Sequence, residues 1–127
     1  MNILVPISPG ELLDKITILE IKLARMTDEA KLANVRVELA ALADVESTLP
    51  ADAALPTLRQ SLREINEALW QIEDDIRDCE RAADFGPRFI ELARAVYHTN
   101  DRRAAVKREV NVALGSRLVE EKSYAAY

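Results

Sequence analysis

One stretch of the chain places an apolar side chain at every step of an alternating four-and-three spacing. The spacing averages 3.5 residues, which lines one side of an α-helix and suits packing against other helices, whereas a half-buried strand needs a spacing of two. The pattern therefore predicts a long helix here and an all-α fold around it. Its members are Leu58, Leu62, Ile65, Leu69, Ile72, Ile76 and Cys79.

Local start and stop signals divide the remaining chain into three more helices. The sequence SPGE at 8–11 matches a capping box with Pro at the first helical position, so a helix should begin there. A cap followed by acids at 27–29 predicts a break and a second helix, which ends before the loop LPADAALP at 49–56. The turn DFGP at 84–87 starts a fourth helix, for which Gly115 is a C-terminal stop.

These elements predict one architecture for the whole chain. We expect an antiparallel helical bundle of four helices in a single domain spanning 1–127. Residues 1–7, MNILVPI, combine β-branched and leucine side chains with a Pro, and are expected to form a short extended N-terminal arm. Residues 116–127 form a C-terminal tail that either frays or docks elsewhere.

Composition excludes several classes of function. With 17 Lys and Arg against 22 Asp and Glu, the net charge of -5 offers no basic field for nucleic acid. A single cysteine, Cys79, rules out an internal disulfide and a cysteine-rich zinc site. No apolar run is long enough to span a membrane, and the opening residues do not form a signal peptide. We therefore expect a cytoplasmic protein without a cofactor.

The first predicted helix carries apolar residues on two sides. A stripe from Leu12 to Met26 lies on one side, whereas Ile18 and Ile21 lie nearly opposite. Either another part of the same chain covers this second side, or it meets its own copy in a symmetric homodimer. We predict the dimer, in which the arm and tail are candidates for exchange between subunits. The predicted interface residues are Asp14, Ile18, Ile21 and Arg25.

The inward stripe of the fourth predicted helix changes from apolar to polar along its length. If the third and fourth helices form an antiparallel hairpin, these polar residues lie near those of the third helix. One interpretation is a polar network that fixes helix register. The other is a pocket for a small anionic ligand, with a cationic wall and orienting amides. The candidate ligand-binding residues are Asn66, Glu73, Asn100, Arg103 and Lys107.

Other reactive residue types lack the arrangements that chemistry requires. His98 is the only histidine and has Asp101 one turn away, but no HExxH sequence or matching carboxylates accompany it, so no metal site is predicted. No Ser belongs to a recognisable nucleophile motif. Trp70 lies beside the main seam of the third helix, as a core-edge residue or an interface anchor. No catalytic residue is predicted.

Several segments together resemble a small bacterial family of uncharacterised proteins. They are the opening SPGELLDKITILEIKLARM, the sequences KLANV, INEALW and YHTNDRRA, and the closing EEKSYAAY. The likeness covers nearly the whole chain. Members of that family occur alone or joined to glycosyltransferase-like or repeat modules, so the resemblance implies a link to surface-glycan assembly. It implies no catalytic residue.

Two looser likenesses suggest an enzyme instead. The segment LREINEALWQIEDDIR is similar to all-helical chorismate mutases, which bind a dicarboxylate between helices with basic residues. All-helical nucleotide pyrophosphohydrolases, which hold magnesium through paired carboxylates, are comparable, although Glu64, Glu67 and Asp101 lack their paired acidic motifs. We predict a non-enzymatic binding or assembly module, with a small helical enzyme for an anionic molecule as the alternative. For the enzyme, the basic residues would be Arg63, Arg77, Arg103 and Lys107.

Overall fold

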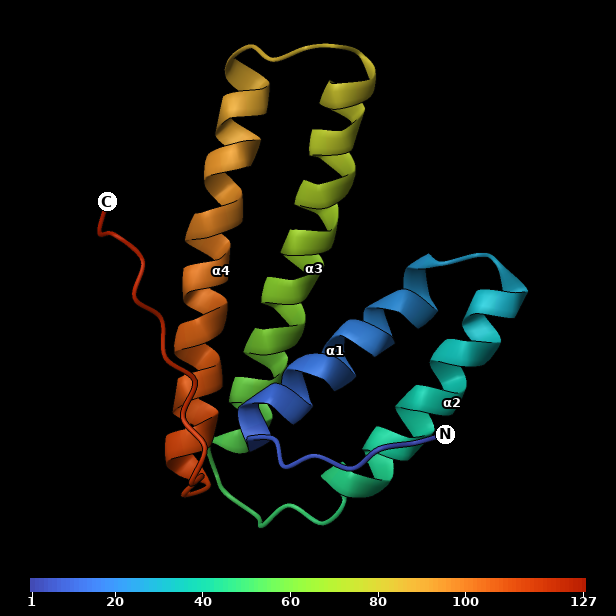
Figure 1. Ribbon diagram of the computed structural model, residues 1–127, viewed down its shortest axis with the longest axis vertical. Helices are drawn as coiled ribbons and strands as arrows, with labels where there is room; N and C mark the ends of the chain where they lie inside the picture. Colours follow the sequence, from blue (N-terminus) through green and yellow to red (C-terminus); the bar gives the residue numbers. More distant parts are fainter.

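The computed structural model describes residues 1–127 and contains four α-helices and no β-strand (Figure 1). The antiparallel helical bundle with an extended N-terminal arm that the sequence predicts is confirmed. No helix combines the length and the apolar character needed to cross a membrane. The helices are α1 (Pro9–Arg25), α2 (Glu29–Glu46), α3 (Leu55–Arg81) and α4 (Pro87–Ala113).

The helices form two unequal hairpins. Helices α3 and α4 run antiparallel along their whole length, and α1 crosses both of them near the end of the hairpin that lies away from their connecting turn (Figure 1). Helix α2 folds back on α1 and has no comparable packing on α3 or α4. Because α1 contacts all three other helices, it occupies the centre of the bundle. This position explains why it carries apolar residues on two sides.

The helix ends follow local capping chemistry. The Ser8 side chain accepts a hydrogen bond from the Glu11 backbone N–H at 3.1 Å, as the capping box predicts. The capping box also predicts that the Glu11 carboxylate accepts a hydrogen bond from the Ser8 backbone N–H. This carboxylate instead contacts Lys107 of α4. Asp28 caps α2 at 3.1 Å, one residue after the predicted Thr27. Helix α4 ends before Gly115, whose φ of 64° glycine adopts without the steric cost that a Cβ brings.

The apolar core lies where α1, α3 and α4 meet. Leu13, Leu62 and Val110, one from each helix, are fully buried against one another. Ile21 from the second apolar side of α1 is also buried within the chain. Half-buried leucines at the helix ends and in the loop between α2 and α3 extend this cluster. They are Leu49, Leu55, Leu58 and Leu114, joined by Val106.

An arginine of α3 ties the outer helix to the rest. The Nε of Arg59 donates to Glu46 of α2 at 2.9 Å, and its Nη1 donates to Glu20 of α1 at 3.2 Å. Hydrogen bonds to Glu46 raise the pKa of the Arg59 guanidinium, against the opposing effect of burial, so it stays charged. Three helices therefore share one cation, which holds the end of α2 beside α3.

The N-terminus of α1 approaches α4 so closely that only glycine fits. A Cβ on Gly10 would lie 2.5 Å from the Lys107 carbonyl oxygen and 2.8 Å from the Asn111 Oδ1. The Gly10 N–H also donates to that Asn111 oxygen at 2.7 Å. Because the nearest atom belongs to the helix backbone, the contact cannot be relieved by a side-chain rotation.

We expect Gly10→Ala to separate α1 from α4. Overpacking costs about 1–3 kcal/mol, which lowers the melting temperature by roughly 4–15 °C in a domain of this size. Thermal unfolding followed by circular dichroism measures the change. Gly86→Ala is the matched control, because its Cβ would meet only the movable Asp84 side chain, at 3.2 Å. Equal melting temperatures for the two variants would contradict the close approach.

Candidate functional site

A buried ion pair joins the first and last helices. The Asp14 side chain of α1 is only 1% exposed, and the Arg103 Nε donates to its Oδ1 at 2.8 Å. The Arg103 Nη2 contacts the other carboxylate oxygen, so the guanidinium binds the carboxylate in a bidentate manner through two parallel N–H groups. A carboxylate buried this deeply needs such a partner, because moving an unpaired charge out of water costs several kcal/mol.

Two further polar residues complete the surroundings of Asp14. The Asn66 Nδ2 of α3 donates to the Asp14 Oδ1 at 3.0 Å and to the Thr17 Oγ1 at 3.1 Å. The Thr17 hydroxyl donates to the Asp14 carbonyl oxygen at 2.9 Å. Every buried side-chain nitrogen and oxygen in the chain has a hydrogen-bond partner. Helices α1, α3 and α4 are thus linked by one satisfied polar network.

A second ion-pair group lies one turn further along α4. The Lys107 Nζ lies 2.7 Å from the Oε2 of Glu11 on α1 and 2.7 Å from the Oε2 of Glu120 in the tail. The Lys107 side chain is only 8% exposed, whereas that of Glu120 is 53% exposed. The buried ammonium is therefore covered by a carboxylate from a segment that otherwise lies on the surface.

These contacts displace the pKa values of Asp14 and Lys107 away from neutrality. Burial alone would raise the pKa of Asp14, but hydrogen bonds from Arg103 and Asn66 outweigh it and hold that pKa below its ordinary value. Burial would lower the pKa of Lys107, but hydrogen bonds with Glu11 and Glu120 raise it overall. Asp14 and Lys107 are therefore both charged at neutral pH.

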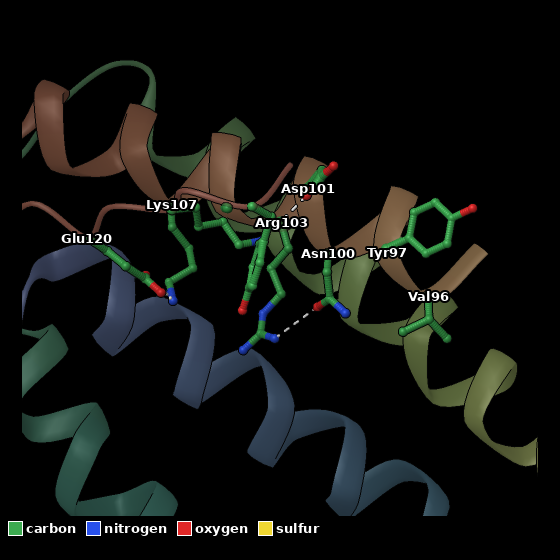
Figure 2. Close-up of a pocket in the computed structure, with 10 residues that line it drawn as sticks. Val96, Tyr97, Asn100, Asp101, Arg103, Lys107 and Glu120 are labelled. Atoms are coloured by element: carbon green, nitrogen blue, oxygen red, sulfur yellow. Dashed lines mark hydrogen bonds and ion pairs between the residues drawn. The ribbon is translucent and has the colours of Figure 1, made fainter. Parts of the chain in front are cut away.

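Two open hollows flank Arg103 and share Asn100 as a common wall. The tail hollow, of about 410 Å³, lies between α4 and the tail (Figure 2). The Trp70 hollow, of about 510 Å³, lies where α1 diverges from α3. Besides Asn100 and Arg103, the tail hollow is lined by Val96, Tyr97, Asp101, Ala104, Lys107, Glu120, Lys122 and Tyr124. The other residues of the Trp70 hollow are Ile18, Ile21, Asn66, Leu69, Trp70, Glu73, Asp74 and Arg77.

The predicted ligand-binding residues are divided between these hollows. Asn66 and Glu73 line the Trp70 hollow with Asn100 and Arg103, so the hairpin brings together the four residues that the sequence placed in one neighbourhood. Lys107 belongs to the tail hollow instead. The five residues therefore do not surround a single enclosed cavity.

The predicted interface residues lie in different environments. Asp14 and Ile21 are buried within the chain, whereas Ile18 is half-buried in the Trp70 hollow. The Arg25 Nε donates to Glu67 of α3 at 2.7 Å. Contacts inside the chain thus account for most of this side of α1, and Ile18 remains reachable by another molecule. The homodimer itself stays a prediction.

The sequence analysis missed the acids that pair with the basic residues of α4. Glu11 was assigned only to helix capping, and Glu120 was not assigned at all. A signal was present, because Glu11 and Asp14 lie about one turn apart on one helix, as Arg103 and Lys107 do on another. Antiparallel helices bring two such pairs together in reverse order.

We expect the Asp14–Arg103 pair to support stability. Asp14→Asn leaves the Arg103 charge unpaired and should cost about 3–5 kcal/mol of unfolding free energy, measured by urea denaturation. The double variant Asp14→Asn with Arg103→Met should lose less than the sum of the single losses, because neither partner is then left alone. Strictly additive losses would contradict the pairing.

The same pair predicts how stability depends on pH. Because the folded pKa of Asp14 is lowered, its contribution is present above the unfolded value of about 3.9. It is lost as the pH falls through the folded pKa. Between about pH 5 and pH 2 the unfolding free energy of the wild type should therefore fall more steeply than that of Asp14→Asn. Parallel curves would show that this carboxyl does not titrate in the folded state as inferred.

The comparisons with known proteins identify a family without an assigned activity. A family model described as a family of unknown function (DUF6165) matches residues 3–127. No curated protein and no solved structure matches the chain. No three His, Cys, Asp or Glu side chains are grouped to hold a metal ion. The family match agrees with the resemblance to uncharacterised proteins, whereas the bacterial origin and the surface-glycan link stay predictions.

Proposed function

The chain belongs to this family of unknown function, DUF6165, and we propose that it is a non-enzymatic assembly module that forms a homodimer through its N-terminal arm. The arm, residues 1–7, has no charged side chain, and Ile3 and Leu4 are 74% and 98% exposed. Proteins that act as monomers rarely leave contiguous apolar segments in water. This exposure is the observation that carries the proposal.

The polar centre of the bundle supports a structural role rather than catalysis. Asp14 neutralises Arg103, and Glu11 and Glu120 neutralise Lys107. A general acid or base works best with a pKa near the operating pH, but the shifted values of Asp14 and Lys107 move away from neutrality. The network is suited to fixing helix register, which is the first interpretation of these residues. A small enzyme with one closed anionic pocket has less support.

The Trp70 hollow offers a surface for the partner's arm. Half-buried Ile18, Leu69 and Trp70 form its apolar part. An extended chain advances about 3.3 Å per residue, so the seven-residue arm reaches roughly 23 Å. Docking there brings the arm onto the side of α1 that the sequence analysis assigned to an interface. In a two-fold dimer each copy gives an arm and receives one.

Arm exchange offers apolar burial of the same order as the cost of association. Burying one large aliphatic side chain contributes about 1.5–3 kcal/mol. Three such side chains on each of two arms, Met1, Ile3 and Leu4, would therefore contribute on the order of 9–18 kcal/mol. Association costs about 4–15 kcal/mol in lost freedom of motion. The balance favours association only if most of the arm is covered.

Light scattering on purified variants tests the dimer. We expect the wild type to have about twice the chain mass of 14.2 kDa, and Leu4→Asp to have the chain mass itself. Leu4 makes almost no contact within its own chain, so this variant should keep its fold. Val37→Asp, at an apolar site on α2 that is 73% exposed, is the matched control and should remain dimeric.

A second variant tests the receiving surface. Ile18→Asp puts a charge into the Trp70 hollow and should also yield the monomer, with circular dichroism confirming the helical content. A wild type of 14.2 kDa would overturn the proposal. A dimer that survives Ile18→Asp but not Leu4→Asp would place the arm elsewhere on the partner and reject the hollow as its site.

A further inference from the structure

We infer that Lys107 and Arg103 form a binding site for one compact oxyanion, a carboxylate or phosphate group, and that the tail carboxylate of Glu120 occupies this site as a built-in competitor. The site lies in the tail hollow. The inference goes beyond the assembly role and does not depend on it, because Lys107 and Glu120 belong neither to the arm nor to the Trp70 hollow, although Arg103 lines both hollows.

The first observation is that an anion already lies in the site. The Glu120 carboxylate is 2.7 Å from the buried Lys107 ammonium. The tail around it is held at the surface by polar contacts, such as Lys122 with Asp101 at 3.5 Å and the Tyr127 hydroxyl with the same carboxylate, and by the Tyr127 ring against the rings of Tyr97 and His98. The tail adds nothing to the Leu13 core cluster. It can therefore leave α4 without opening the bundle, which would expose Lys107 to solvent.

The second observation is that Arg103 has hydrogen-bonding capacity left. Its Nε and one Nη2 proton donate to the Asp14 carboxylate. Its Nη1 donates to the Asn100 Oδ1 at 3.4 Å, which is a long hydrogen bond. A guanidinium has five N–H groups, so donors remain, and the Arg103 side chain is 29% exposed. Figure 2 shows Arg103 and Lys107 extending from α4 in the same direction, toward α1. They are one helical turn apart, as two donors for one anion require.

Charge balance favours a ligand group of low negative charge, such as a carboxylate or a singly ionised phosphate. Lys107 and Arg103 are matched by Glu11 and Asp14, so the group is neutral before Glu120 is counted. A monoanion that replaces Glu120 leaves the local charge unchanged. A polyanion would add repulsion, because the Asp101 carboxylate lines the same hollow. The volume of about 410 Å³ is that of a small-molecule site, and Tyr97 and Val96 supply an apolar wall for the rest of the ligand.

The test uses two tail variants with the same change in charge. Glu120→Gln removes the competitor, whereas Glu121→Gln removes a neighbouring carboxylate that pairs instead with exposed Arg108 at 3.5 Å. Inorganic phosphate and acetate, titrated separately at constant ionic strength, are the probes. Chemical shifts of backbone amides in α4 and the tail report binding. We expect Glu120→Gln to bind at least one probe about tenfold more tightly than the wild type, because a tethered competitor acts at millimolar effective concentration.

The outcomes separate the two ligand classes and the inference itself. Tighter binding of phosphate alone assigns a phosphate ligand, and tighter binding of acetate alone assigns a carboxylate. Equal gains in Glu120→Gln and Glu121→Gln would show general electrostatic attraction and overturn the inference. Failure of Glu120→Gln to bind either probe at tens of millimolar would overturn it as well. Lys107→Met in the Glu120→Gln background should abolish binding, with its circular dichroism spectrum as the check on folding.

Discussion

The pairing of Asp14 with Arg103 determines how α1 sits on the rest of the bundle. An apolar contact such as that between Leu13, Leu62 and Val110 is non-directional and tolerates sliding of one helix along another. A buried carboxylate does not tolerate such sliding, because a shift of the helix by one residue would leave its charge unpaired. The polar link therefore specifies register, and the apolar core supplies most of the favourable free energy.

The central position of α1 follows from this register and has a consequence for the surface. Gly10 brings the start of α1 against the backbone of α4, whereas the other end of α1 diverges from the α3–α4 hairpin (Figure 1). The divergence opens the Trp70 hollow and leaves the part of the hairpin near its turn as two helices only. Ile18 and Trp70 are half-buried for this reason.

Local signals predicted the helices well, because caps, prolines and apolar spacing act within a few residues. The break before Glu29 and the stop at Gly115 are examples. The site was predicted only in part. A helical wheel gives the direction of Asp14 but not its partner, so this residue was assigned to an interface, although it is buried inside the chain. Its contact with Arg103 spans 89 residues and depends on how the hairpins pack.

The two ends of the described chain differ in the forces that hold them. The arm has no charged side chain, so the association that we propose for it would depend on the hydrophobic effect, which salt screens little. The tail docks through the Tyr127 ring and through the exposed charges of Glu120, Glu121 and Lys122. Added salt weakens ion pairs between exposed groups, with a screening length of about 8 Å at physiological salt. Only the Glu120 contact reaches a buried partner, where screening is weaker. That single contact therefore decides whether the tail covers Lys107 or gives way to another anion.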